Sequence, residues 1–351
     1  MRDNRPVSEV IRTEGIAAAI GLKHVASLLF TYRCTIACKH CLFNCSPTKP
    51  SVHTPLPDAI EYLRQLHATD RVIHIAGGEA MMFYPQLLEI CREAYQEGIP
   101  PHFIETNASF AVDDQATRDW LLELKDAGVQ GLLISADPYH QQFCPPDRYL
   151  RCYCTAVEVF GNRNVAAANL SIDQLGELRD IGRDPVRLME FTCAHPPMLV
   201  GRAGDALSAC FEDKPVDELL DTMWHGGAGH IDCRQEFDPE TMWEIHIDPY
   251  GNIQTCCGII VGNAKETPLP DLMLTGFLGR SPIVDAVYHG GPKALLDLAI
   301  RHGYAPRSGY PQKCGLCWET RLFLRQFHPE ALGPDEVYEH DRFPWEAGHS
   351  E

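Results

Sequence analysis

Short apolar runs alternate with longer amphipathic stretches between about residues 25 and 205 of this 351-residue chain. Such alternation is typical of parallel strands joined by crossover helices, so it predicts an α/β fold. We expect strands at six places: Val25–Tyr32, Val72–Ala76, His102–Glu105, Gly131–Ser135, Val165–Ile172 and Arg187–Cys193. Six repeats predict a partial (β/α)6 parallel barrel, because a closed barrel has eight and typically takes about 250 residues. Polar groups that perform chemistry should then gather at the carboxyl ends of the strands.

The alternation fades after about Ala206, where the chain becomes richer in Gly, Pro and Cys. That composition is typical of a small domain held together by metal. We therefore expect four regions: an N-terminal extension at residues 1–24, the barrel at 25–228, a small cysteine-rich auxiliary-cluster domain at 229–330 and a tail at 331–351. The tail is polar and acidic, and we expect it to be partly disordered.

The charge balance narrows the choice of partners. Thirty basic residues stand against 48 acidic ones, a formal net charge of -18. Such a charge repels nucleic-acid backbones and anionic lipid surfaces. The apolar runs near the N-terminus are short and are broken at Gly21, Lys23 and His24, unlike a signal peptide or a spanning helix. We predict a cytoplasmic protein with neither nucleic acid nor a membrane as its partner.

The chain has 15 cysteines, an odd number, and no export signal. Disulfide frameworks belong to small secreted domains, so metal ligation explains these cysteines better. Four of them have no ligand-like spacing and are interpreted as buried free thiols: Cys91, Cys152, Cys154 and Cys210.

Cys34, Cys38 and Cys41 form a CxxxCxxC set (RCTIACKHC) in the loop that leaves the first predicted strand. Three thiolates this close require a cation or a cluster between them, and iron-sulfur clusters are held by such thiolates. The alternative is a structural zinc site, for which His40 or Cys45 could supply the fourth ligand. A four-iron cluster with three protein ligands leaves one iron open to a substrate or cosubstrate.

The CxxxCxxC set after a first strand resembles the radical S-adenosylmethionine (SAM) superfamily, and the resemblance covers about residues 25 to 205. It implies a [4Fe-4S] cluster on Cys34, Cys38 and Cys41 whose open iron chelates SAM. The residue before the third cysteine is often aromatic in that family and is His40 here, which is a mild departure. Reductive cleavage of SAM would give a 5'-deoxyadenosyl radical that abstracts a hydrogen atom from the substrate.

Gly77, Gly78 and Glu79 follow the second predicted strand and resemble the family's GGE motif. Glycines let the backbone approach a ligand closely, and the carboxylate could accept hydrogen bonds from the SAM amino group. Alone, this tripeptide would be an ordinary turn.

Polar residues at further strand ends complete the predicted SAM site. Four of them could bind a nucleoside, although each could also simply cap a helix: Thr106, Asn107, Ser135 and Asp137. Arg202 lies in a GRA sequence after the sixth predicted strand, and the resemblance suggests that it pairs with the SAM carboxylate. A surface salt bridge is the alternative for Arg202.

A second cysteine set resembles the Twitch domain, the shortened relative of the SPASM domain: Cys233, Cys256 in GNIQTC, then Cys314 and Cys317 in KCGLC. Residues Trp243–Ile253 alternate and turn at Pro249–Gly251, as the hairpin of that domain would. The resemblance implies a second, auxiliary [4Fe-4S] cluster. Cys233 is its least secure ligand, and Cys257 could replace or assist Cys256. A structural zinc site on the same four cysteines is the alternative to the cluster.

The resemblance leaves the reaction open among oxidation, epimerisation and cross-linking of a small-molecule or peptide substrate. An epimerase would need a thiol to return a hydrogen atom, for which Cys144, Cys193 and Cys210 are candidates. The electron donor would be a flavodoxin- or ferredoxin-type protein. A different class of function is a non-catalytic iron-sulfur electron carrier or a zinc-stabilised binding module, which would need neither the GGE motif nor the polar strand ends.

Overall fold

The computed structural model describes residues 3–168, 175–219 and 233–339. These residues contain an open eight-stranded sheet of order β5-β4-β3-β2-β1-β6-β7-β8. Its strands are β1 Val25–Leu29, β2 Val72–Ala76, β3 Phe103–Thr106, β4 Gly131–Ser135, β5 Val165–Ala168, β6 Glu244–Ile247, β7 Asn252–Thr255 and β8 Ile259–Asn263. The predicted parallel-dominated α/β fold is thereby confirmed.

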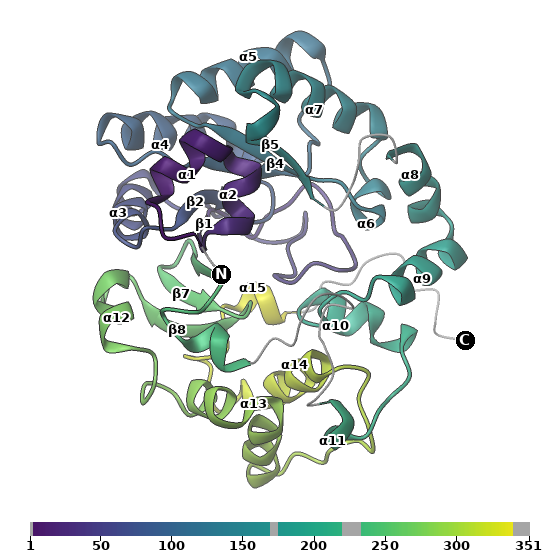
Figure 1. Ribbon diagram of the computed structural model, residues 1–351. Coiled ribbons are helices and arrows are strands. Elements are labelled where there is room, and N and C mark those ends of the chain that lie inside the picture. Colours follow the sequence, from purple (N-terminus) through teal and green to yellow (C-terminus); the bar gives the residue numbers. More distant parts are fainter. Residues whose placement is uncertain (1–2, 169–174, 220–232, 340–351) are drawn as a thin grey trace.

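Strand β1 lies in the middle of the sheet and pairs in parallel with β2 on one side and β6 on the other. Strands β2 to β5 continue the parallel part, whereas on the other side of the sheet β7 pairs in antiparallel fashion with both β6 and β8. Every residue of β1 and β2 is buried, as expected for parallel strands covered on both faces. The hairpin predicted around Pro249–Gly251 is confirmed as β6 and β7 (Figure 1).

Helices fill the connections between the strands. Their bounds are α1 Val7–Glu14, α2 Ile16–Leu22, α3 Leu56–His67, α4 Tyr84–Gln96, α5 Asp114–Asp126, α6 Pro138–Gln141, α7 Pro146–Phe160, α8 Leu175–Arg183, α9 Pro185–Ala194, α10 Arg202–Leu207, α11 Val216–Leu219, α12 Leu269–Thr275, α13 Pro282–Arg301, α14 Lys313–Leu324 and α15 Asp335–Tyr338.

The prediction of a strand at Arg187–Cys193 is wrong, because this segment lies within helix α9. Asp184 caps that helix by accepting hydrogen bonds from the backbone N–H groups of Val186 and Arg187, and Pro185 occupies its first turn. The sixth parallel strand is β6, which comes from much later in the sequence and pairs with β1. The fifth predicted strand is confirmed over Val165–Ala168, and residues 169–174 lie outside the described part.

The N-terminal extension forms helices α1 and α2, which lie across the sheet (Figure 1). Their side chains Val10 and Ile16 are fully buried in a cluster that includes Val72 of β2 and Phe103 of β3. Val72 and His74 are two residues apart on β2 and therefore point to the same face of the sheet. The two helices thus cover this face with apolar side chains at Val72, on the N-terminal side of His74.

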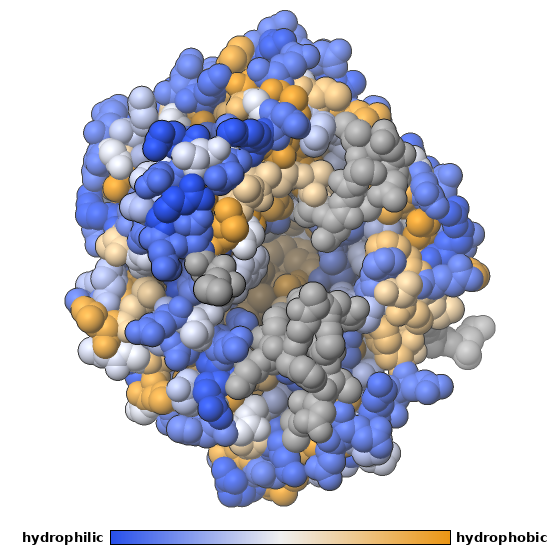
Figure 2. All heavy atoms as spheres, in the orientation of Figure 1, coloured by the Kyte–Doolittle hydropathy of each residue, from blue (hydrophilic) through white to orange (hydrophobic). Residues whose placement is uncertain are grey.

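The C-terminal third adds the β7–β8 hairpin to the sheet and packs α13 and α14 beside it (Figure 1). The predicted domain boundary at residues 228 and 229 lies outside the described residues. The first residues of the predicted tail are ordered into α15, in which Val337 and Tyr338 are buried. In the described residues, no helix is both long and apolar enough to cross a membrane. Figure 2 shows a mostly hydrophilic face with a central hollow in which apolar surface is visible.

Replacing Ile16 by Ala tests the packing of α2 on the sheet. The side chain is fully buried, so we expect a loss of roughly 2–5 kcal/mol in the free energy of unfolding. Urea denaturation of the purified protein measures it. Leu274→Ala is the control, because Leu274 is 85% exposed and should change stability by less than about 0.5 kcal/mol. Equal losses in the two variants would contradict this packing.

Candidate functional site

A cavity of about 320 Å³ opens at the carboxyl ends of the parallel strands. Nine residues that the sequence singled out line it: Cys34, Cys38, Cys41, Gly77, Gly78, Thr106, Asn107, Ser135 and Asp137. They come from the ends of β1 to β4, which parallel pairing brings to one edge of the sheet. The structure therefore gathers the first cysteine set and the polar strand ends around one space.

Arg202 holds the loop that carries the three cysteines. It is the first residue of α10 and is 3% exposed. Its guanidinium donates hydrogen bonds to the carbonyl oxygens of Cys38, Asn44 and Cys45 at 3.0, 3.0 and 2.9 Å. The side chain that the resemblance assigned to the SAM carboxylate thus binds the backbone of the cysteine loop.

Gly77 and Gly78 dock against the start of the same loop. The N–H of Gly78 donates to the carbonyl of Thr31 at 2.7 Å, and Glu79 donates to that of Arg33 at 3.0 Å. A Cβ atom on either glycine would collide with one of these carbonyl oxygens, and Gly77 has a φ of 131°. The close approach that the glycines permit is therefore an approach to the cysteine loop itself.

The Glu79 carboxylate accepts hydrogen bonds from protein donors. Oε1 accepts from the Met81 N–H at 3.2 Å and from Thr106 Oγ1 at 2.9 Å, and Oε2 accepts from the Asn107 N–H at 2.8 Å. Burial raises the pKa of Glu79 to about 7, and these hydrogen bonds oppose that rise. Glu79 thus joins the GGE turn to the end of β3.

The sulfurs of Cys34 and Cys41 accept hydrogen bonds. Asn107 Nδ2 lies 3.5 Å from Cys34 Sγ, and the Cys45 N–H lies 3.3 Å from Cys41 Sγ. Burial raises the pKa of Cys34 well above its ordinary value. A hydrogen bond from Cys45 lowers the pKa of Cys41 well below its ordinary value, with Arg202 assisting. Sequence reasoning considered Cys45 only as a fourth ligand of a zinc site, and its position just outside the CxxxCxxC spacing was the available signal for this second role.

Asp137 lies between two imidazoles. Its carboxylate is 2.9 Å from His40 Nε2 and 2.9 Å from His140 Nδ1, and it also caps α6. Burial would raise the pKa of Asp137, but His140 and His40 hold it well below its usual range. His40 also stacks on Tyr139, with ring centroids 4.5 Å apart. Asp137 therefore positions two rings at the cavity wall.

A polar layer of buried histidines and partly exposed glutamates lies at the same cavity and was missed by the sequence analysis. His74 Nε2 is 2.8 Å from Glu244 Oε1, which is 3.6 Å from His246 Nε2. Glu105 Oε1 accepts a hydrogen bond from Ser135 Oγ at 3.2 Å. The signal was a polar side chain at alternate positions of otherwise apolar strands, as in VIHIA and EIHI.

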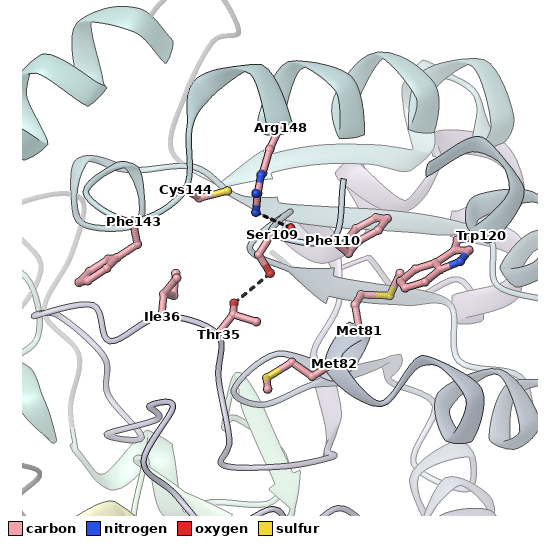
Figure 3. Close-up of a pocket in the computed structure, with 10 residues that line it drawn as sticks. All are labelled: Thr35, Ile36, Met81, Met82, Ser109, Phe110, Trp120, Phe143, Cys144 and Arg148. Carbon is pink, nitrogen blue, oxygen red and sulfur yellow. Dashed lines mark hydrogen bonds between the residues drawn. The ribbon is translucent and has the colours of Figure 1, made fainter. Parts of the chain in front are cut away.

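A second cavity, of about 330 Å³, adjoins the cysteine loop at Thr35 and Ile36. Figure 3 shows Cys144 at its wall beside Arg148, which donates to the Ser109 carbonyl at 2.8 Å. The other two thiols considered as hydrogen donors lie elsewhere, where Cys193 Sγ is 3.5 Å from the carbonyl oxygen of Cys210. The structure does not bring these three thiols together.

The second cysteine set converges on helix α14. Burial raises the pKa of Cys314 well above its ordinary value, and the thiols of Cys233 and Cys317 raise it further. Burial also raises the pKa of Cys256, with Cys317 and Cys314 again among the causes. Burial raises the pKa of Cys257 too, but there the largest neighbouring cause is Glu244. The four thiols of the predicted set therefore share one environment.

The sulfur spacing bears on the choice between zinc and a cluster. Zinc binds sulfur at about 2.3 Å, which places the sulfurs of a tetrahedral site about 3.8 Å apart. Among the described residues, only Cys38 with His40 and His140 forms a group of three ligand atoms within 4.8 Å of one another. The sulfurs of Cys34, Cys38 and Cys41 do not all lie within 4.8 Å of one another, as the corners of a single zinc site would.

Replacing Arg202 by Lys tests its hold on the cysteine loop. Lysine cannot reach all three carbonyl oxygens, so we expect the free energy of unfolding to fall by roughly 2–5 kcal/mol and iron binding at the first cysteine set to weaken. Urea denaturation and iron analysis measure these effects. Arg118→Lys is the control, because Arg118 pairs with Glu158 on the surface. Unchanged stability and iron content in the Arg202 variant would refute this role.

The pH dependence of stability tests the polar layer. Burial lowers the pKa of His246 to about 4 from its ordinary value of 6.5. The unfolded chain therefore binds a proton that the folded chain does not between these pH values, so stability falls as the pH is lowered from 6.5 to 4. His246→Gln should remove up to about 3 kcal/mol of that fall in urea denaturation of the apo protein. Identical pH profiles for both proteins would contradict a buried, neutral His246.

Solved structures similar to this chain include BtrN in complex with AdoMet and 2-DOIA, at 13% identity and a TM-score of 0.42, covering 72% of this chain and 82% of that one. Native anSMEcpe with bound AdoMet has 11% identity and a TM-score of 0.41, covering 87% and 97%. HydG, a maturase of the [FeFe]-hydrogenase, has 14% identity and a TM-score of 0.32, covering 57% and 48%. No curated protein sequence matches the chain.

Residues 28–189 match the family described as the radical SAM superfamily. The matched segment contains the CxxxCxxC set, the GGE turn and the polar ends of β3 and β4. These are the elements that the structure places around one cavity. The chain therefore contains a radical SAM domain at residues 28–189.

Proposed function

We propose that this protein cleaves SAM reductively and uses the resulting radical to abstract a hydrogen atom from a small polar substrate. The observation that carries the proposal is the cavity lined by Cys34, Cys38 and Cys41 together with the polar ends of β3 and β4. A [4Fe-4S] cluster bound there would supply the electron that splits SAM into methionine and a 5'-deoxyadenosyl radical.

The residues of the chain hold and shield this site. Arg202 fixes the cysteine loop, and Asn107 donates a hydrogen bond to Cys34 Sγ, an interaction that tunes iron-sulfur centres. The thiols of Cys34 and Cys38 have raised pKa values because they are buried, so binding of the cluster releases protons. Thr106 and Ser135 offer hydroxyl groups at the cavity for a nucleoside. A flavodoxin- or ferredoxin-type protein would deliver the electron.

The second cysteine set would hold an auxiliary [4Fe-4S] cluster on Cys233, Cys256, Cys314 and Cys317. The shared environment of these thiols supports the assignment. The surroundings of Cys257 favour Cys256 as the ligand, because the Cys257 thiol interacts with Glu244 and not chiefly with the other thiols of the set. Four thiolates would complete the coordination of such a cluster.

The polar layer favours a small polar substrate. Glu105, Glu244, His74 and His246 all line the cavity that contains the cysteines. Carboxylates and imidazoles in this position can bind hydroxyl or amino groups of a compact molecule. An extended peptide could reach the layer only with a polar side chain, and this is the alternative that substrate screening distinguishes.

Anaerobic assay of SAM cleavage tests the proposed function. The protein reconstituted with iron and sulfide and then reduced should form 5'-deoxyadenosine from SAM, whereas Cys38→Ala should lose at least 100-fold of that activity, on the order of 3 kcal/mol. Cys154→Ala is the control, because Cys154 lies on α7 away from the cavity lining and is exposed, so the prediction that it is buried is wrong. Chromatography of the quenched reaction measures the product.

Metal analysis separates the remaining possibilities. About eight iron atoms per chain would fit two four-iron clusters, and about four would remove the auxiliary assignment. Zinc bound at Cys38, His40 and His140 together with no 5'-deoxyadenosine would contradict the proposed function and favour a zinc-stabilised binding module.

A further inference from the structure

Arg321 is a buried cation on the helix that carries Cys314 and Cys317. It follows Cys317 by four residues on α14, so the two side chains lie on the same face of the helix. It is fully buried and is the largest such side chain in the described residues. A buried charge is costly unless an opposite charge or hydrogen bonds compensate it.

The described residues compensate Arg321 only in part. Its Nη1 donates to the carbonyl oxygens of Cys256 and Cys257 at 3.2 and 3.0 Å. Its Nε and Nη2 are buried and have no hydrogen-bond partner in the described residues. No carboxylate there forms an ion pair with Arg321, although its guanidinium lies 5.2 Å from the centre of the Trp318 ring. Two donors are thus left for a group that the described residues do not supply.

The surroundings identify that group as an anion at the second cysteine set. Arg321 donates a hydrogen bond to the carbonyl oxygen of Cys256 and follows Cys317 by one turn of α14, so its guanidinium lies beside two residues of this set. The carbonyls that it binds belong to Cys256 and Cys257, which have φ values of 47° and 40°. Non-glycine residues in this left-handed region are strained, and strain of this kind collects at functional sites. The guanidinium therefore holds the turn that presents Cys256.

We propose that Arg321 is the counter-charge of the auxiliary cluster and sets its reduction potential, an inference that rests on the proposed auxiliary cluster. A [4Fe-4S] cluster with four thiolates is anionic, and gaining one electron makes it more so. A buried cation beside it stabilises the reduced form because the interaction is strong in a poorly solvated site. Arg321 thereby favours the role of electron acceptor for this cluster.

A redox titration of the full-length chain tests the proposal. Cys34→Ala, Cys38→Ala and Cys41→Ala are combined so that only the auxiliary cluster remains. In this background, Arg321→Gln keeps hydrogen-bond donors but loses the charge, and Arg321→Lys keeps the charge. We expect four iron atoms per chain in all three proteins. The Gln variant should lower the reduction equilibrium constant at least tenfold, which is about 59 mV for one electron, and the Lys variant less.

Controls and contrary outcomes separate this inference from the assignment of the cluster. Arg325→Gln removes a charge from the end of the same helix, where Arg325 pairs with Asp335, and should leave the potential unchanged. Electron paramagnetic resonance at set potentials provides the readout. No iron with Arg321 intact would overturn the auxiliary cluster itself. Iron with an unchanged potential in the Gln variant, or iron lost from both the Gln and the Lys variants, would overturn the counter-charge role.

Discussion

The site depends on the hydrogen bonds by which Arg202 holds the cysteine loop. That loop has little regular secondary structure, so its buried carbonyl groups need partners from elsewhere. Arg202 supplies three such bonds, and the Gly77–Gly78 turn docks against the beginning of the loop. Without these contacts, the three thiols would have no fixed geometry around a common cavity.

The C-terminal region reaches back to the same loop. The carbonyl oxygen of Glu339 accepts hydrogen bonds from Asn44 Nδ2 at 2.6 Å and from Lys49 Nζ at 3.0 Å. Trp318 of α14 donates to Asp205 of α10 at 2.8 Å and stacks on Tyr338. The helix that carries two thiols of the second set is therefore joined to the helix that begins with Arg202. Any change in the packing of one cysteine site should be felt at the other.

The pattern of apolar and turn residues predicted the elements that are determined by residues close together in the sequence. Apolar runs located β1 to β4, and the turn around Gly251 located the hairpin. The prediction of a strand at Arg187–Cys193 was wrong because its apolar residues suit a short strand as well as a helix. The cap at Asp184 favours the helix. The pairing of β6 with β1 joins segments far apart in sequence, which no local pattern could reveal. Arg321 was missed for the same reason, since its burial depends on tertiary packing.

The central claim is that three cysteine thiolates leave one iron open to SAM. The most direct measurement is electron-nuclear double resonance on the reduced protein, with SAM labelled by ¹⁵N at its amino group and with the second cysteine set replaced by alanine. The account predicts a hyperfine coupling from this nitrogen to the remaining cluster. A cluster signal that SAM leaves unchanged, with no coupling from the label, would contradict it.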